Sequence, residues 1–264
     1  MKNTKSMINW LIAGGVAMAM VTSLAAQTAN ERTGQVVRLK GAARYSTGNN
    51  IWQPVKLGTI LKAGYIVQTA QNSILDIVLG AGESGASRPP VADTLSYQPT
   101  AEQDVIRVWE DTALGFDKLA VMNTGADQVT DTQLDLRSGR IFGTVKKLST
   151  ASRYEIKIPN GVAGIRGTIY TITADGVVQV LVGSVVIAWT GPDGVAHTQV
   201  VNGGQQFDVR TGILSTIPNR MEMIRAAKAA RIGPNTPPQT FVVDHTIYYI
   251  SPRTGQNGNG SGSD

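Results

Sequence analysis

The sequence predicts an all-β fold: a solenoid-like or rolled antiparallel β domain that carries one short helix near its C-terminus. Short segments rich in β-branched residues recur at intervals of about 8 to 12 residues, each bounded by Gly, Asn, Asp or Pro. Glycine contributes 29 of the 264 residues, which supplies the turns that many short strands need. Only the segment 219–232 has the composition of a good helix.

Strands are expected along the first part of the chain wherever an apolar, β-branched run ends at a turn signal. They span residues 35–39, 65–68, 74–79, 106–109, 118–122, 133–137 and 140–145. The segment between Gly80 and Asp104 is polar and rich in Pro and Gly, so it is expected to be an exposed loop insertion.

The clearest strand pattern lies within residues 154–209. Three turn signals punctuate it: Asp175-Gly176, Gly183-Ser184 and Pro192-Asp193-Gly194. The runs between them, 168–172, 177–182 and 185–189, should therefore form a meander. Val177-Val178 and Val185-Val186-Ile187 are apolar on both sides of the pleat, which is typical of strands covered on two faces. We expect the core here.

The helix expected over 219–232 follows Pro218 and stops at Gly233-Pro234. One of its faces carries Met223, Ala226, Ala227 and Ala230. This face predicts a helix that caps the sheet edge; a helix that binds a partner or a membrane surface is the alternative. Residues 241–250 are expected to form a last strand, and the Gly/Asn/Ser-rich residues 254–264 a disordered tail.

The N-terminal 26 residues have the order of a secretory signal peptide. Lys2 and Lys5 precede an apolar stretch at 10–21, and small residues follow it. We expect cleavage near Ala25 or Ala26, and hence an exported protein, periplasmic or extracellular. An uncleaved membrane anchor is the alternative, and membrane contact is expected only in that case.

The charge pattern gives no sign of a nucleic-acid partner. The first 26 residues hold two lysines and no acidic residue, so the remainder carries a net charge of +3 rather than +5. The basic clusters, Lys146-Lys147 and 220–231, lack interleaved aromatic residues, so they are interpreted as solvated faces. With no cysteine in the chain, disulfides and thiol chemistry are excluded and stability must come from packing.

Motifs for catalysis, cofactors or metals are weak. Gly80, Gly82 and Gly85 give a G-x-G-x-x-G spacing, but Pro89-Pro90 prevents the helix that binds pyrophosphate, and Ser84 lacks a hydrolase elbow. His197 and His245 have no second histidine at ligand spacing, so both are expected to be strand residues. Asp127, Asp131 and Asp135 do not match a calcium loop and are interpreted as strand-face or turn carboxylates. We expect no enzyme, no cofactor and no metal.

Two stretches together resemble the FecR-type domain. The first, 34–79, holds Gly-Gln-Val-Val-Arg-Leu-Lys-Gly at 34–41 and then Trp52, Gly58 and Gly64; the second, 134–182, holds Pro-Asn-Gly-Val-Ala-Gly-Ile-Arg-Gly-Thr at 159–168. The resemblance covers about residues 33–190. Its most specific part contains Gly164, Arg166, Gly167 and Thr168, interpreted as a structural motif at a strand bend or close crossing. Arg166 and Trp52 are the candidate binding residues, each with a structural role as the alternative.

The resemblance implies a periplasmic sensor and protein-interaction module without catalysis. In signalling members of the family, the domain senses the state of an outer-membrane transporter and transmits the signal to a cytoplasmic sigma factor. Tyr65 stands where an acidic residue is expected after Gly64, and nine residues before the apolar run are too few for a sigma-binding helical domain. We therefore expect an exported, stand-alone protein that binds an envelope protein or a glycan; an anchored periplasmic sensor in iron-uptake-type signalling is the alternative.

The expected organisation has four parts. Residues 1–26 are the signal peptide, 33–210 the FecR-type β domain, 211–253 a helix and strand extension, and 254–264 the disordered Gly/Ser/Asn tail. The sequence does not name the partner.

Overall fold

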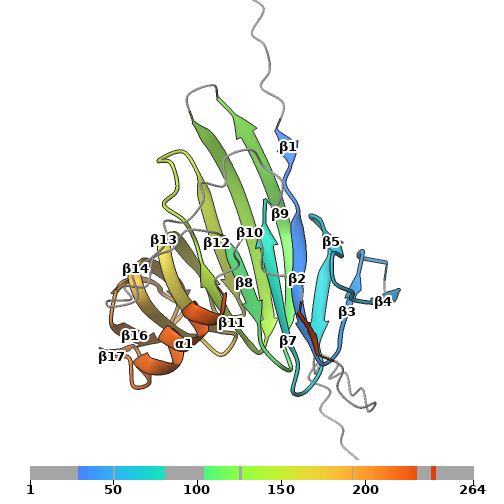
Figure 1. Cartoon of the computed structure of the whole chain (residues 1–264). Helices are drawn as coiled ribbons and strands as arrows, with labels where there is room; N and C mark the ends of the chain where they lie inside the picture. The colour runs from blue at the N-terminus through green and yellow to red at the C-terminus, as the bar shows by residue number, and fades with distance from the viewer. Residues whose placement is uncertain are drawn as a thin grey trace, which may run out of the picture.

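A computed structural model describes residues 29–49, 51–80, 104–124, 127–191, 193–230 and 239–241. One helix and many strands make up this part of the chain (Figure 1). The first strands are β1 (Asn30–Glu31), β2 (Gly34–Lys40), β3 (Ala43–Ser46), β4 (Trp52–Pro54), β5 (Ile60–Leu61), β6 (Ile66–Thr69), β7 (Ile74–Leu79), β8 (Val105–Val108) and β9 (Ala113–Asn123). The later elements are β10 (Gln128–Ser138), β11 (Arg140–Thr144), β12 (Arg153–Ile158), β13 (Gly161–Thr173), β14 (Val177–Thr190), β15 (Ala196–Asn202), β16 (Gln205–Asp208), β17 (Ile213–Thr216), α1 (Arg220–Ala230) and β18 (Gln239–Phe241).

The long strand β13 joins two branches of sheet. Its first half pairs with β12, which leads through β10, β9, β6 and β3 to β4. Its second half pairs with β11, which leads through β8, β7 and β2 to β5. Most pairings are antiparallel, whereas β10 pairs with β12 and β18 pairs with β2 in parallel. The all-β class, the rolled form and the single short helix are confirmed.

The main core lies between the two branches. Leu134 and Ile156 reach it from one branch, and Leu75, Ile106 and Ile141 from the other; each is fully or almost fully buried. Along β10 and β12 the buried residues alternate with exposed or half-buried ones, as a sheet with one covered face requires. All four residues of β8 are buried, because this strand is covered on both faces. The curled sheet therefore closes around its own apolar face.

The sheet bends where β13 and β14 carry bulges. Gly167 and Gly183 have φ values of +64° and +85°, which glycine adopts without steric cost. The bulge in β14 changes which residues face the main core: Val178 and Val180 before it, Val185 and Ile187 after it. The turn predicted at Gly183-Ser184 is therefore wrong. The strand continues because β13 and β15 pair with it beyond the bulge.

Helix α1 covers a second apolar cluster on the other face of β13 and β14 (Figure 1). The predicted face is confirmed, because Met223, Ala226, Ala227 and Ala230 are all buried. They pack with a strand set made up of Val105, Phe142, Ile169 and Leu181. Arg38 from β2 donates a hydrogen bond of 2.5 Å to the carbonyl of Ala229 in the last turn, where a cation is favourable for the helix dipole.

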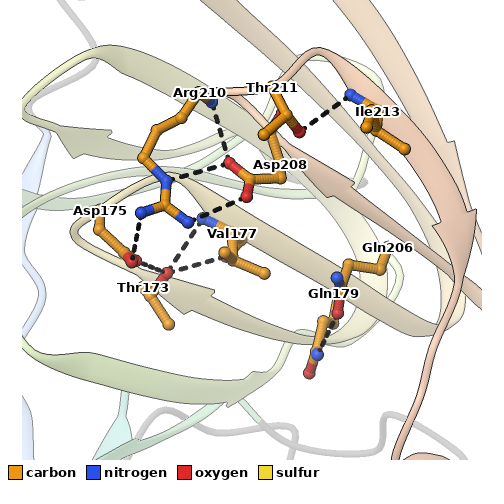
Figure 2. Close-up of polar contacts among 9 residues, drawn as sticks. All are labelled: Thr173, Asp175, Val177, Gln179, Gln206, Asp208, Arg210, Thr211 and Ile213. Atoms are coloured by element: carbon orange, nitrogen blue, oxygen red, sulfur yellow. Dashed lines mark hydrogen bonds and ion pairs between the residues drawn. The ribbon is translucent and has the colours of Figure 1, made fainter.

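A cluster of polar contacts fixes the β13–β14 hairpin to the β16–β17 hairpin (Figure 2). The Arg210 guanidinium donates to both carboxylate oxygens of Asp208, at 3.2 and 3.0 Å, and lies 3.7 Å from Asp175. Hydrogen bonding to Arg210 lowers the pKa of Asp208. The turn predicted at Asp175-Gly176 is confirmed: Gly176 donates to the Thr173 carbonyl at 3.1 Å.

Several expectations lie outside the described residues: the signal peptide, loop residues 81–103, His245, most of the 241–250 strand and the tail. Within the described ranges, no helix has the length and apolar character needed to cross a membrane.

Candidate binding surface

An apolar patch lies on the outer face of the sheet beyond the bend. Val162, Val186 and Val200 are 40%, 47% and 46% exposed. Gly164 pairs with Val186 and Val186 with Val200, while Ala188 pairs with Val162 in the next row. We call these five residues the outer valine face. Helix α1 covers the same sheet only on the other side of the bend.

This patch corrects one expectation. The run Val185-Val186-Ile187 was expected to be covered on both faces, yet Val186 is exposed while Val185 and Ile187 are fully buried. The sequence pattern correctly indicated two apolar faces. In the structure of the single chain only one of them is covered.

Charged residues border the patch on the adjoining strands. Asp131 of β10 forms ion pairs with Lys118 at 2.6 Å and with Arg153 at 3.1 Å. The Arg153 guanidinium also lies 3.9 Å from the Glu155 carboxylate. Partial burial acts to raise the pKa of Asp131, but hydrogen bonds from Arg153, Lys118 and Gln133 outweigh it, and the pKa is lowered. Glu155 pairs with Gly164 and so brings this charged border next to the valines.

A polar groove lies where the connection from β11 to β12 passes the first residues of β10. Its volume is about 720 Å³. Lys146, Lys147 and Arg166 line it together with hydroxyl and amide side chains, which include Gln128, Thr130, Ser149 and Ser152. Ser152 Oγ accepts a hydrogen bond from the Thr130 backbone at 3.0 Å and lies 2.8 Å from Ser149 Oγ. Asp127 is the acidic residue among those lining the groove.

Lys146 and Lys147 form one side of this groove, which we call the lysine wall, and buried contacts hold it in place. Asp104 accepts a hydrogen bond from the Lys146 backbone at 2.9 Å, and its other carboxylate oxygen lies 2.6 Å from Arg32. Both side chains of this ion pair are 1% exposed. Val145 and Thr168 exchange two backbone hydrogen bonds, of 2.9 and 3.0 Å, which join the wall to β13.

The structural motif lies directly beside the groove. Gly167 passes the Lys147 backbone so closely that a Cβ built on it would lie 3.3 Å from Lys147 Cα. A Cβ on Gly164 would meet no atom nearer than 3.8 Å. Thr168 is buried and donates its hydroxyl to the Ser184 carbonyl at 2.8 Å.

The two candidate binding residues lie far apart. Arg166 is exposed on β13 and lines the groove, next to the row of the outer valine face that holds Gly164. Trp52 is half-buried on β4, with the Arg44 guanidinium 4.4 Å from its ring centroid. Figure 1 places β4 at the opposite end of the molecule from β14. Only Arg166 belongs to the candidate surface.

The residues considered for metal binding or acid–base chemistry have ordinary partners. Asp131 and Asp135 lie on β10, and Asp135 pairs with Arg137 at 2.8 Å. His197 is exposed, stacks on Trp189 and lies 3.4 Å from Asp193. Within the ranges that the structure describes, no three metal-ligating side chains converge.

Comparison with known families supports part of the sequence interpretation. Residues 100–186 match the family model described as FecR protein, which confirms the FecR resemblance over that part of the chain. The match includes the Gly164–Thr168 motif and the lysine wall of the groove. No curated protein matches the sequence significantly.

Two solved structures are similar over part of their length. Both are crystal structures of a protein assigned as an anti-sigma factor from Parabacteroides distasonis ATCC 8503, at 1.65 and 2.50 Å resolution. The first aligns with 12% identity and a TM-score of 0.31, over 46% of this chain and 54% of that one. The second aligns with 12% identity and a TM-score of 0.28, over 70% of this chain and 59% of that one.

Proposed function

We propose, from the FecR domain at residues 100–186, that this chain is a non-enzymatic binding module whose outer valine face holds a partner protein. The family match supports a protein of the FecR-type regulatory class. The observation that carries the finer proposal is the exposure of Val162, Val186 and Val200 on neighbouring strands.

The composition of the surface favours a protein as the occupant. Protein interfaces have an apolar centre and a polar, solvated rim. Here the valines lie beside the ion pairs of Asp131, Arg153 and Glu155. Because neighbouring strands hold the valines in fixed register, the patch is rigid and binding costs little conformational entropy.

We also propose that the protein is exported. We place the mature chain outside the cytoplasm, beginning at Ala26 or Gln27, because Lys2, Lys5 and the apolar run 10–21 have signal-peptide order. Intact-mass measurement on envelope fractions tests this. A dominant species that retains the first 25 residues and sediments with inner membranes would favour the anchored sensor.

Site-specific photo-crosslinking tests the binding face. The full chain is produced in its native host with a photoreactive phenylalanine at Val186 or, as the control, at Ile60, which is 44% exposed on β5. The proposal predicts a discrete crosslinked protein from position 186 and not from position 60. The same product from both positions, or none from 186, would contradict it.

A further inference from the structure

The groove beside the valine face gathers three cationic side chains and, among the described residues that line it, one acidic residue, Asp127. Lys146, Lys147 and Arg166 all line it. Among the described residues, no carboxylate oxygen lies within 4 Å of the side-chain nitrogens of these three residues, whereas Asp131 and Asp135 each have a cationic partner. Unpaired cations that share one concave site attract an anionic ligand.

Most of the other residues of the lining carry hydroxyl or amide groups, and Leu148 adds an apolar surface. Gln128, Thr130, Ser149 and Ser152 offer amide and hydroxyl groups that both donate and accept hydrogen bonds. Thr130 is only 2% exposed, and its Oγ1 has no hydrogen-bond partner within the described structure. A buried hydroxyl without a partner costs free energy, which a ligand or a water molecule can recover.

The wall of the groove is held in place before any ligand arrives. The Lys146 backbone is hydrogen-bonded to buried Asp104, and Gly167 packs against the Lys147 backbone. Because the backbone is already fixed, binding needs to order only the side chains, which lowers its entropic cost. The volume of about 720 Å³ lies within the roughly 300 to 1,000 Å³ typical of ligand sites.

We propose that this groove binds an acidic oligosaccharide. The cations face its carboxylate or sulfate groups, and the serine, threonine and glutamine side chains bond its hydroxyls. An acidic peptide would satisfy the cations equally, but it carries fewer hydroxyl groups than a saccharide to pair with the hydroxyl and amide side chains of the lining. The groove is a different site from the outer valine face. The saccharide proposal can therefore be correct or wrong whatever binds to the valine face.

Calorimetric titration of the mature full-length protein tests the proposal. The probes are a galacturonic acid tetrasaccharide for carboxylates, a heparin-derived tetrasaccharide for sulfates, neutral cellotetraose, and a short poly-glutamate peptide. We expect one or both acidic saccharides to bind at least about tenfold more tightly than cellotetraose and poly-glutamate. Binding should weaken at high salt, because screening reduces the attraction between charges.

Matched variants locate the site. Lys147→Gln and Arg166→Gln each remove one groove charge, whereas Lys157→Gln removes one exposed charge on β12, outside the groove lining. We expect about a tenfold loss for the first two and less than a twofold change for the third, with unchanged thermal unfolding. Equal losses in all three variants, no saccharide binding, or tighter binding of poly-glutamate would overturn the proposal. Crosslinking from Val186 should be unaffected by Lys147→Gln if the two sites work separately.

Discussion

Replacing Gly167 by alanine should destabilise the protein because of where this glycine lies. Its φ of +64° is in the left-handed region, and a Cβ there would lie 3.3 Å from Lys147 Cα. An L-residue in that conformation costs about 1 to 2 kcal/mol. The contact adds to this cost, since Lys147 is tied through its neighbours to Asp104 and Thr168.

A smaller effect opposes the loss. Alanine restricts the unfolded chain more than glycine does, which recovers about 0.4 to 1 kcal/mol where the native conformation permits. We therefore expect a net loss of about 1 to 2 kcal/mol for Gly167→Ala. For a domain of this size, this corresponds to a fall in Tm of about 2 to 8 °C.

Urea denaturation of the purified mature protein measures the loss, with Gly164→Ala as the matched control. Gly164 lies three residues earlier on the same strand, lacks a positive φ and has free space for a Cβ. Its replacement should change the free energy of unfolding by less than about 0.5 kcal/mol. Equal stability of both variants, or a greater loss at Gly164, would refute the bend interpretation. Unchanged stability together with lost ligand binding in Gly167→Ala would show that the motif is a recognition site instead.

Three further predictions concern the ion pairs and the helix. Asp104→Asn should cost about 3 to 5 kcal/mol by urea denaturation, because it removes the carboxylate charge 2.6 Å from the buried Arg32 guanidinium; a loss below about 1 kcal/mol would contradict this. Asp131→Asn should cost up to about 1 kcal/mol at pH 7. The folded-state pKa of Asp131 is lowered, so its contribution is present above the unfolded pKa and lost as pH falls through the folded one. The difference from wild type should shrink as the pH falls below the unfolded carboxyl pKa of about 3.9 and vanish once the pH is below the folded-state pKa. A constant difference across pH would disprove the ionic origin. Met223→Ala should cost about 2 to 4 kcal/mol and expose α1 to limited proteolysis; unchanged cleavage would show that the helix is held by other contacts.

Local pattern predicted the elements well where one face of the sheet or helix is covered. The apolar run 74–79 became β7 with the same bounds, and all four residues predicted for the apolar face of α1 are buried. These features depend only on the period of apolar residues along the chain. The strand at Arg153–Ile158 was not anticipated, although it alternates clearly in its burial. His197 was expected in a strand and lies in β15, whose bounds were not predicted.

The sequence could not distinguish a turn from a bulge at Gly183. Both need a glycine with positive φ, and the outcome depends on whether partner strands continue past it. Here Gly203 donates a hydrogen bond to the Gly183 carbonyl at 2.9 Å, and β13 pairs with the residues beyond. Those partners are brought together only by the fold.

The candidate surfaces were hidden for the same reason. Arg166 and Lys147 lie in separate strands and connections, and they share a groove because Val145 and Thr168 pair. The cluster Lys146-Lys147 was interpreted as a solvated face, because the residues next to it in the sequence indicate nothing more specific. Predicting that Val186 is exposed would have required knowing which part of the sheet α1 covers.

The most direct test of the binding-module proposal compares partner capture by two surface variants. Mature wild-type protein, the double variant Val186→Lys and Val200→Lys, and the control Ile60→Lys are each immobilised at equal amounts and exposed to envelope extract. All three substituted residues are 44% to 47% exposed, so folding should be preserved in each variant. We predict that the protein crosslinked from Val186 is retained by wild type and the control and lost, by at least about tenfold, from the double variant. Equal retention by all three proteins would contradict the assignment of the outer valine face as the partner-binding surface.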